Sequence, residues 1–179
     1  MTAVAALIDK GVIHMGADSA GVGGLHLVVR KDEKVFVNGP FIMSCTSSFR
    51  MIQLLRYSFK PPKRPKCITD AEFMSTVFVD AIRGCFKTGG FARSESGQEA
   101  GGTFIVGYKG KLYSIDSDFQ VGIPADSFCA AGCGVDLCLG SLYSTKGQPP
   151  KERLITALKA AERFSAGVRG PFILKSLGR

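Results

Sequence analysis

The sequence predicts an α+β fold, a four-layer αββα sandwich in which two antiparallel sheets lie between two helical layers. Three observations support this prediction. Apolar segments of strand length, separated by turn signals, occupy the first 45 residues and recur from residue 103. Two segments with helical periodicity follow each of these strand blocks. Because each block is apolar enough to need cover on both faces, stacking the sheets and covering them with helices is the simplest arrangement.

The first strand block is punctuated by strong turn signals. Asp9-Lys10-Gly11 is typical of a hairpin, Gly21-Val22-Gly23-Gly24 interrupts the chain, and Asn38-Gly39-Pro40 predicts another turn. The predicted strands are residues 3–8, 12–17, 25–29, 34–37 and 41–45.

Two helices are expected next. Apolar residues recur at helical spacing from about residue 47 to Phe59, and Pro61 ends that helix. The second helix begins at Thr69, which forms a capping box with Glu72, and ends at Gly89.

The second half of the chain repeats this order. The polar, Gly-rich segment 92–102 is expected to be a mobile surface loop. The further predicted elements are strands at 103–108, 111–115 and 128–131, helices at about 135–143 and 150–166, and a last strand at 171–175.

Length and composition are those of a globular protein, and we expect residues 1–179 to form a single domain. Hydrophobic residues make up 45% of the chain and charged residues 21%. No apolar run reaches the ~18 residues that a membrane-spanning helix needs, and no basic segment followed by an apolar one marks a secretory signal. We therefore expect a cytoplasmic protein with no membrane partner.

The cysteines and histidines do not form the pattern of a metal site. A chain of this length does not need its six cysteines to pair, and Cys129-x3-Cys133 lacks the second pair of ligands that zinc sites have. His14 and His26 lie in apolar strands with no further ligand nearby in sequence. We expect reduced, mostly buried thiols, structural histidines, and neither a metal nor a cofactor.

The net charge of +8 comes partly from a Pro-rich basic segment at residues 60–66. Such a charge permits nucleic-acid binding through simple electrostatics. The segment has no interleaved aromatic residues, however, and matches no nucleic-acid-binding motif. A solvated loop is the better interpretation, and we expect no nucleic-acid partner.

The N-terminus suggests a catalytic group. If Met1 is removed, Thr2 carries both a hydroxyl nucleophile and a free α-amine. Such an amine titrates near pH ~8 and is partly neutral at neutral pH, and threonine with its own amine is a known nucleophile–base pair. Because very many proteins begin with Met-Thr, the hypothesis depends on Asp18 and Lys34 at set distances further on.

The segments around these residues resemble the proteasome β-type subunits and the bacterial and phage proteasome-like threonine peptidases. The resemblance lies in residues 2–7 and 12–19, in the distance of Lys34 from the threonine, and in segments 102–108 and 131–134. Segment 45–55 is more similar to the phage and actinobacterial members than to eukaryotic proteasomes. The resemblance extends over nearly the whole chain, with the 60–66 and 92–102 loops fitting least well. It implies the N-terminal-nucleophile hydrolase fold. Since only Met1 precedes Thr2 here, we expect maturation to depend on a methionine aminopeptidase.

The resemblance assigns catalytic roles. Thr2 Oγ1 is the nucleophile, the α-amine or Lys34 is the base, and Asp18 holds Lys34 by a charge-assisted hydrogen bond. A lysine beside the α-amine makes physical sense, because a neighbouring cation lowers the pKa of the amine. Backbone N–H groups at Ser47 or Ser48, where a strand passes into the first helix, are expected to form the oxyanion hole. Both serines could simply be helix caps.

Two positions differ from the pattern usual in that family. Gly132-Cys133-Gly134 stands where the family has Gly-Ser-Gly, whose serine supports the threonine amine, and a thiol is a weaker hydrogen-bonding group than a hydroxyl. Glu162-Arg-Phe-Ser165 stands for Asp-x-x-Ser, with an acidic side chain one methylene longer. Cys133, Glu162 and Ser165 are therefore expected at the site, although Glu162 could equally be an ordinary exposed helix residue.

Two functions are consistent with these observations. The first is a threonine endopeptidase that hydrolyses peptide or unfolded-protein substrates in a self-assembled homo-oligomeric ring, with a possible ATPase partner; the ring is implied by the resemblance. The Gly-rich segment at 21–24 would let an extended substrate pair with a strand edge. The alternative is a catalytically silent proteasome-like subunit that serves in assembly or binding, as Cys133, Glu162 and an attached Met1 suggest.

Overall fold

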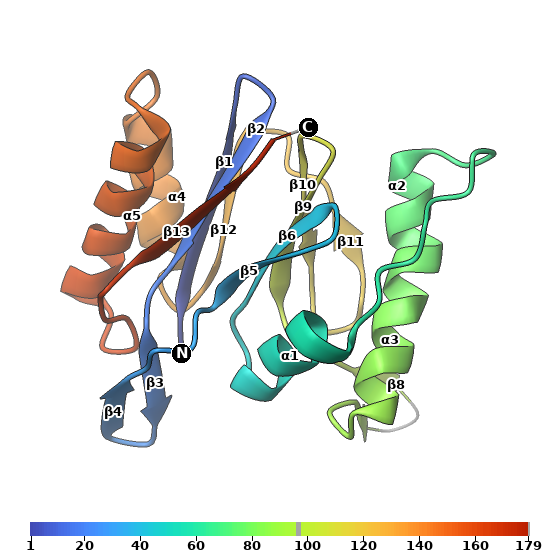
Figure 1. Cartoon of the computed structure of the whole chain (residues 1–179). Coiled ribbons are helices and arrows are strands. Elements are labelled where there is room, and N and C mark those ends of the chain that lie inside the picture. The colour runs from blue at the N-terminus through green and yellow to red at the C-terminus, as the bar shows by residue number, and fades with distance from the viewer. Residues whose placement is uncertain (96–97, 179) are drawn as a thin grey trace.

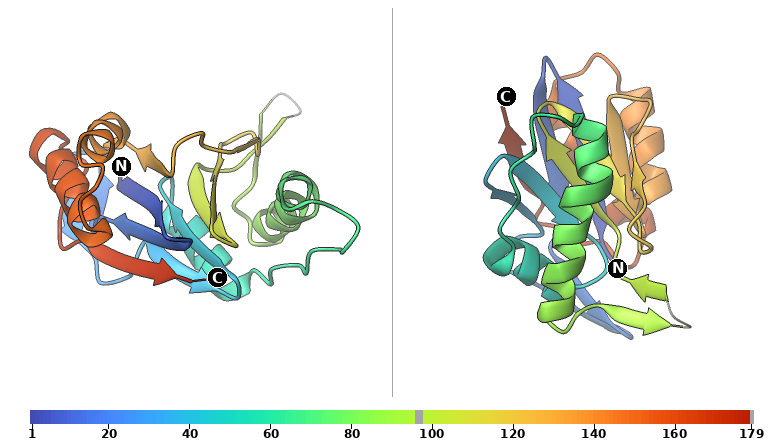
Figure 2. Two further views of the ribbon diagram at one scale, coloured as in Figure 1. Left: turned by 90° about the horizontal axis from the view of Figure 1, so that it is seen from above. Right: turned by 90° about the vertical axis from the view of Figure 1, so that its right-hand side faces the viewer.

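The computed structural model describes residues 1–95 and 98–178. Two antiparallel sheets lie side by side, and each carries helices on the face turned away from the other sheet (Figures 1 and 2). The strand order is β12-β1-β2-β13 in the first sheet and β11-β10-β9-β6-β5 in the second. The predicted combination of antiparallel sheets and helices is confirmed.

The first sheet is built on the hairpin of β1 (Ala3–Asp9) and β2 (Val12–Ala17). β12 (Phe128–Gly132) pairs with the other edge of β1, and β13 (Ile173–Leu177) pairs with the other edge of β2. The first and last strands of the chain therefore belong to one sheet.

The apolar sequence of β1 is explained by burial on both of its faces. Ala3, Ala5 and Leu7 pack against the helices, whereas Val4 and Ala6 pack against the second sheet. This division follows from the two-residue period of a strand. The helices on this side are α4 (Val135–Ser144) and α5 (Pro150–Phe164).

The second sheet carries the remaining helices. Its strands are β5 (Val35–Asn38), β6 (Phe41–Cys45), β9 (Phe104–Tyr108), β10 (Lys111–Ile115) and β11 (Val121–Gly122). The helical segments are α1 (Phe49–Gln53), its π-helical continuation η1 (Leu54–Ser58), α2 (Asp70–Phe73), the π-helical η2 (Met74–Phe78) and α3 (Val79–Thr88). The core between them is aromatic: the ring of Phe41 stacks on Tyr108 and Phe78 with centroid distances of 4.5 and 4.7 Å.

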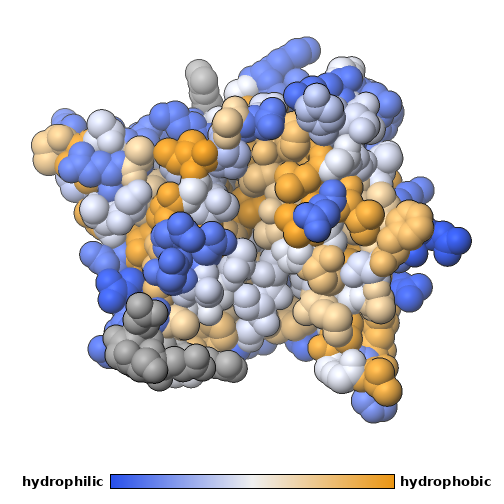
Figure 3. All heavy atoms as spheres, turned by 180° about the vertical axis from the view of Figure 1, so that it is seen from behind, coloured by the Kyte–Doolittle hydropathy of each residue, from blue (hydrophilic) through white to orange (hydrophobic). Residues whose placement is uncertain are grey.

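A two-stranded ribbon of β3 (Ala20–Gly23) and β4 (His26–Val29) projects near the N-terminus (Figure 1). The Gly-rich segment 21–24, expected to interrupt the strands, belongs to this ribbon instead. Hydrophobic side chains are exposed on the ribbon, seen at the lower right of Figure 3. They are Leu25, Leu27, Val28 and Val29. A group of exposed hydrophobic side chains is typical of a surface that contacts another molecule.

The segment 92–102, expected to be a mobile surface loop, contains a short two-stranded ladder. β7 (Arg93–Glu95) pairs with β8 (Gln98–Ala100), because the backbone alone can form a ladder whatever the side chains. Residues 96–97 lie outside the described part of the chain. β13 begins at Ile173, two residues later than predicted, since Pro171 has no N–H to donate to a strand partner.

All six cysteines are free thiols, but only Cys45, Cys129 and Cys138 are fully buried, fewer than expected. His14 Nδ1 lies 2.8 Å from Ser176 Oγ, whereas His26 is exposed on the ribbon. Within the described residues, no helix is long and apolar enough to cross a bilayer, and no three acidic, Cys or His side chains form a group that could hold a metal ion.

Candidate active site

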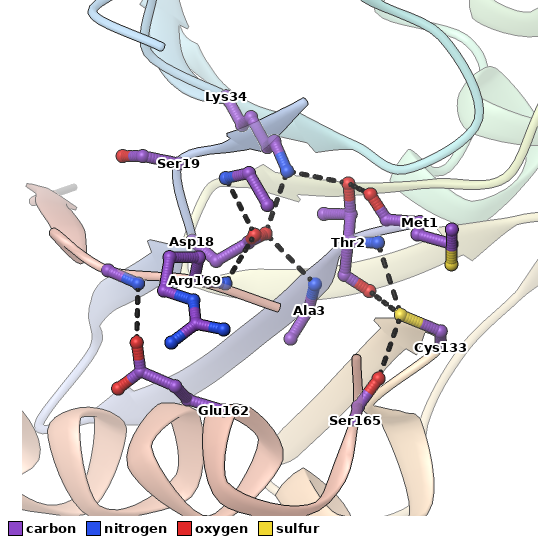
Figure 4. Close-up of polar contacts among 12 residues, drawn as sticks. Met1, Thr2, Ala3, Asp18, Ser19, Lys34, Cys133, Glu162, Ser165 and Arg169 are labelled. Carbon is purple, nitrogen blue, oxygen red and sulfur yellow. Dashed lines mark hydrogen bonds and ion pairs between the residues drawn. The ribbon is translucent and has the colours of Figure 1, made fainter. Parts of the chain in front are cut away.

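Thr2, Asp18 and Lys34 come together where three strand ends meet (Figure 4). Thr2 immediately precedes β1 and Asp18 immediately follows β2, and the register that pairs Val4 with Ala17 puts both at the same end of the hairpin. Lys34 comes from the other sheet, one residue before β5. All three residues are buried. The structure thus assembles the three side chains that the sequence predicted as a unit.

The ammonium group of Lys34 bridges the other two side chains. Its Nζ donates hydrogen bonds to Thr2 Oγ1 and to Asp18 Oδ1, both at 2.8 Å. The Lys34 side chain is only 1% exposed. This burial lowers the pKa of Lys34, and the charge and hydrogen bond of Asp18 oppose that shift. A lysine with a lowered pKa is more readily neutral, and a neutral amine at this distance can accept the proton of a hydroxyl.

Asp18 is held by more than its lysine partner. Oδ1 also accepts a hydrogen bond from Ala3 N at 3.1 Å, and Oδ2 accepts from Ala20 N at 2.9 Å and from Arg169 N at 3.2 Å. A buried carboxylate is tolerated when it is paired and fully hydrogen-bonded. The three backbone donors therefore fix the carboxylate that positions Lys34.

The nitrogen of Thr2 faces a thiol. With Met1 attached, this nitrogen is an amide N–H, and it donates to Cys133 Sγ at 3.3 Å. The thiol donates to the carbonyl oxygen of Thr2 at 3.4 Å, and Ser165 Oγ donates to the sulfur at 3.3 Å. Cys133 is exposed. Cys133 therefore contacts the atom that would become the α-amine, as expected from its sequence position, and Ser165 lies directly behind it (Figure 4).

Gly132 allows this close approach. Its φ is +93°, and a Cβ at this position would lie 2.1 Å from the carbonyl oxygen of Thr2. Any larger residue would clash with the backbone of the candidate nucleophile. The close contact with the Thr2 backbone therefore explains why the residue before Cys133 is a glycine.

Ser47 and Ser48 both make structural hydrogen bonds near Thr2. Ser47 Oγ accepts from Thr103 N at 3.0 Å, and Ser48 Oγ caps α1 by accepting from Arg50 N at 3.1 Å. Ser48 is therefore the helix cap, whereas Ser47 connects the start of the helix to the segment that enters β9. Both serines line the same cavity as Thr2.

Glu162 supports the site from further away. Its Oε1 accepts a hydrogen bond from Gly170 N at 2.8 Å, in the segment that follows α5 (Figure 4). The preceding residue, Arg169, is one of the backbone donors to Asp18. The hydrogen bond between Gly170 N and Glu162 Oε1 thus holds the segment that supports Asp18. The Glu162 side chain is half-buried, so it is not an ordinary exposed helix residue.

Thr2 opens into a cavity of about 640 Å³. The ribbon β3–β4, residues 30–32 and residues 46–49 form its walls, and Met1 also lines it. The volume is in the range of small-molecule and peptide side-chain sites. The candidate nucleophile therefore lies at the wall of a hollow large enough for part of a peptide, beside Met1.

Sequence reasoning missed several of the groups that hold the site together. Ala20 and Arg169 act through backbone N–H groups, which leave no mark on the residue type. Ser19 donates from Oγ to the carbonyl oxygen of Pro171 at 2.6 Å and so ties the two segments that flank Asp18. The position of Ser19 directly after Asp18 is the sequence feature that could have indicated its role near the site.

Comparison with solved structures finds similar folds over nearly the whole chain. Thiobacillus denitrificans BPH, alone and in complex with Epoxomicin, superimposes with a TM-score of 0.82 and 17% identity over 99% of this chain and 98% of that chain. HslV from Trypanosoma brucei superimposes with a TM-score of 0.70 and 13% identity, over 99% of this chain and 100% of that chain. No protein-family model and no curated protein sequence matches the chain. The chain therefore shares, from end to end, the fold of BPH and HslV.

Proposed function

We propose that this protein is a threonine endopeptidase in which Thr2, freed by removal of Met1, is the nucleophile. The observation that carries the proposal is the buried contact of Lys34 Nζ with both Thr2 Oγ1 and Asp18 Oδ1 at 2.8 Å. The similarity of fold to HslV and to BPH, one structure of which contains Epoxomicin, supports it.

In the proposed reaction, Thr2 Oγ1 attacks the carbonyl carbon of a substrate peptide bond. Its proton passes to neutral Lys34 or to the freed α-amine, either of which is a suitable base for a hydroxyl nucleophile. The C–N bond then breaks, the leaving amine takes that proton, and the acyl group stays on Thr2 as an ester. Water attacks the ester, releases a carboxylic acid and restores the hydroxyl.

The remaining site residues receive supporting roles. Backbone N–H groups of Ser47 or Ser48 line the cavity beside Thr2 and would stabilise the negative oxygen of the tetrahedral intermediate. Cys133 would accept a hydrogen bond from the α-amine, as it does from the amide nitrogen, and Ser165 would hold the thiol. Glu162 is a positioning residue that acts through the segment next to Asp18.

We propose further that residues 1–179 form one domain with the four-layer αββα architecture of N-terminal-nucleophile hydrolases, and that copies assemble into a ring. The two helix-covered sheets support the first statement, and the exposed hydrophobic ribbon supports the second. An ATPase partner and a cytoplasmic location remain predictions.

Intact mass spectrometry with and without a peptide epoxyketone tests the proposal. The reagent offers two electrophilic carbons, one for the hydroxyl and one for a free amine, and so reports on both groups. We expect protein purified from cells to lack Met1 and to gain one inhibitor per chain, and the Thr2→Ala variant to gain none. Retention of Met1, or an equal adduct on the variant, would contradict it.

The second candidate function is a silent assembly subunit. It is favoured by Cys133, an exposed thiol where a hydroxyl would be the stronger partner for the α-amine. Ring-sized assemblies without any adduct at Thr2 would support this candidate, and a covalent adduct at Thr2 would exclude it.

A further inference from the structure

Arg30 is a fixed part of the cavity wall beside Thr2. Its Nε and Nη2 both donate to the carboxylate of Asp32 at 2.7 Å, and its guanidinium carbon lies 3.7 Å from the centroid of the Phe49 ring. Its stem runs against Gly21, where an added Cβ would lie 2.7 Å from Arg30 Cδ. The guanidinium group is therefore held along one edge, on one face and at its stem.

This arrangement leaves one nitrogen of the guanidinium free to bind a ligand. Asp32 takes up Nε and Nη2, and in the described part of the chain Nη1 makes no hydrogen bond. A guanidinium donates readily to carboxylates. Because Arg30 is already ordered, a ligand would not have to immobilise it, and binding loses less conformational entropy.

The charges around the cavity favour an anion. Arg30 and Asp32 balance each other, whereas Lys31 lines the same cavity and forms no ion pair with any described residue. Among the described residues, the charged side chains that line the cavity are Arg30, Lys31 and Asp32, and their formal charges sum to +1. The guanidinium also covers a face of Phe49, which reduces the aromatic surface available to a large apolar side chain.

We propose that Arg30, assisted by Lys31, makes the enzyme prefer an acidic side chain on the acyl side of the cleaved bond. The inference rests on the proposed function, in which the acyl group stays bonded to Thr2 Oγ1. The cavity that Thr2 shares with Arg30 is the space beside Thr2 into which the side chain of that residue can extend. Arg30 is thus a specificity-determining residue for a threonine endopeptidase that cleaves after Asp or Glu.

Three peptide epoxyketones that differ only in the residue bonded to the ketone, Glu, Leu or Lys, test this inference. The rate of covalent labelling of the Met1-free protein is measured by intact mass. We expect the order Glu, Leu, Lys from fastest to slowest. Arg30→Gln is expected to slow the Glu probe about tenfold or more and the Leu probe by less than about threefold, because it removes a charge-assisted hydrogen bond.

Two further variants separate recognition from folding. Arg30→Lys keeps the charge and most of the stem, so the preference for Glu over Lys is expected to persist. Arg83→Gln removes a surface arginine of α3 that pairs with Asp80 of the same helix and with Glu99 of β8, and it is expected to leave all three rates unchanged.

The outcomes distinguish the inference from the proposed function. If no probe labels Thr2, the proposed function fails and the inference fails with it. If the Leu probe labels Thr2 but Glu is not preferred, or if Arg30→Gln slows all three probes equally, the proposed function stands. In those cases Arg30 is only a structural residue and the inference is overturned.

Discussion

The two sides of Thr2 are built differently. On the hydroxyl side, Lys34 and Asp18 are buried and joined to Thr2 by hydrogen bonds of 2.8 Å. On the nitrogen side, Cys133 is exposed and its sulfur contacts Thr2 and Ser165 at 3.3 Å or more. The first is a charged, buried cluster with fixed donors, and the second is a series of weaker hydrogen bonds around an exposed thiol.

This contrast between the two sides of Thr2 predicts where substitutions have large effects. A buried charge depends on each partner, because water cannot replace one that is lost. An exposed thiol can exchange a protein partner for water at little cost. We therefore expect changes on the hydroxyl side to alter both activity and stability, and changes on the nitrogen side to alter activity modestly.

The largest effect is expected from replacing Lys34. Lys34→Met removes a candidate base and should lower kcat for a fluorogenic peptide by about 10²- to 10⁴-fold, the range typical of general acid–base catalysis. Lys34→Arg keeps the charge, but a guanidinium stays protonated and cannot serve as a base, so this variant should be nearly as inactive. Full activity of Lys34→Arg would show that the charge, not proton transfer, is what matters.

The next largest effect is on stability. Asp18→Asn leaves the Lys34 ammonium buried without a counter-charge and should lower the free energy of unfolding by about 3–5 kcal/mol, measured by denaturant unfolding. The matched control is Asp32→Asn. Asp32 pairs with Arg30 at the surface, where the Arg30 side chain is 37% exposed and the Asp32 side chain 44% exposed. We expect the control to cost less than about 1 kcal/mol. Similar losses for the two variants would remove the contrast between a buried and an exposed ion pair.

The pH dependence of stability gives a smaller, sharper test. Burial lowers the pKa of Lys34 below its ordinary value of ~10.4, so the unfolded chain binds that proton more tightly than the folded chain. The free energy of unfolding should therefore rise with pH between the folded-state pKa and about 10.4, by at most about 1.4 kcal/mol per pH unit. The slope is taken as the difference between the protein and Lys34→Met at each pH. A difference that falls with pH in this window would contradict a lowered pKa.

The smallest effect is expected on the nitrogen side. Cys133→Ser supplies a stronger hydrogen-bonding group to the α-amine and should raise kcat/KM by about 2- to 10-fold, the value of one net hydrogen bond. Ser165→Ala removes the hydrogen bond that Ser165 Oγ donates to Cys133 Sγ, and it should lower kcat/KM by no more than the same factor. A loss of activity on Cys133→Ser would instead show that the thiol has a role of its own.

Local sequence patterns correctly predicted the features that depend on neighbouring residues along the chain. The strand bounds of β2, β6 and β10 agree with the prediction, because each is flanked by a short turn with its own residue signature. Lys10 and Gly11 adopt the positive φ values of 47° and 79° that such a turn requires. The grouping of Thr2, Asp18 and Lys34 was also predicted, since their spacing resembles that of a known family.

The support of that group depends on contacts between segments that are far apart in the sequence. The donor Arg169 N is 151 residues from Asp18, and Glu162 acts through the same distant segment. The placement of Arg30 against Phe49 likewise depends on how the ribbon lies relative to α1. Backbone N–H groups carry no residue signature, and contacts between distant segments follow from the packing of whole sheets and helices. Local periodicity contains no information about either.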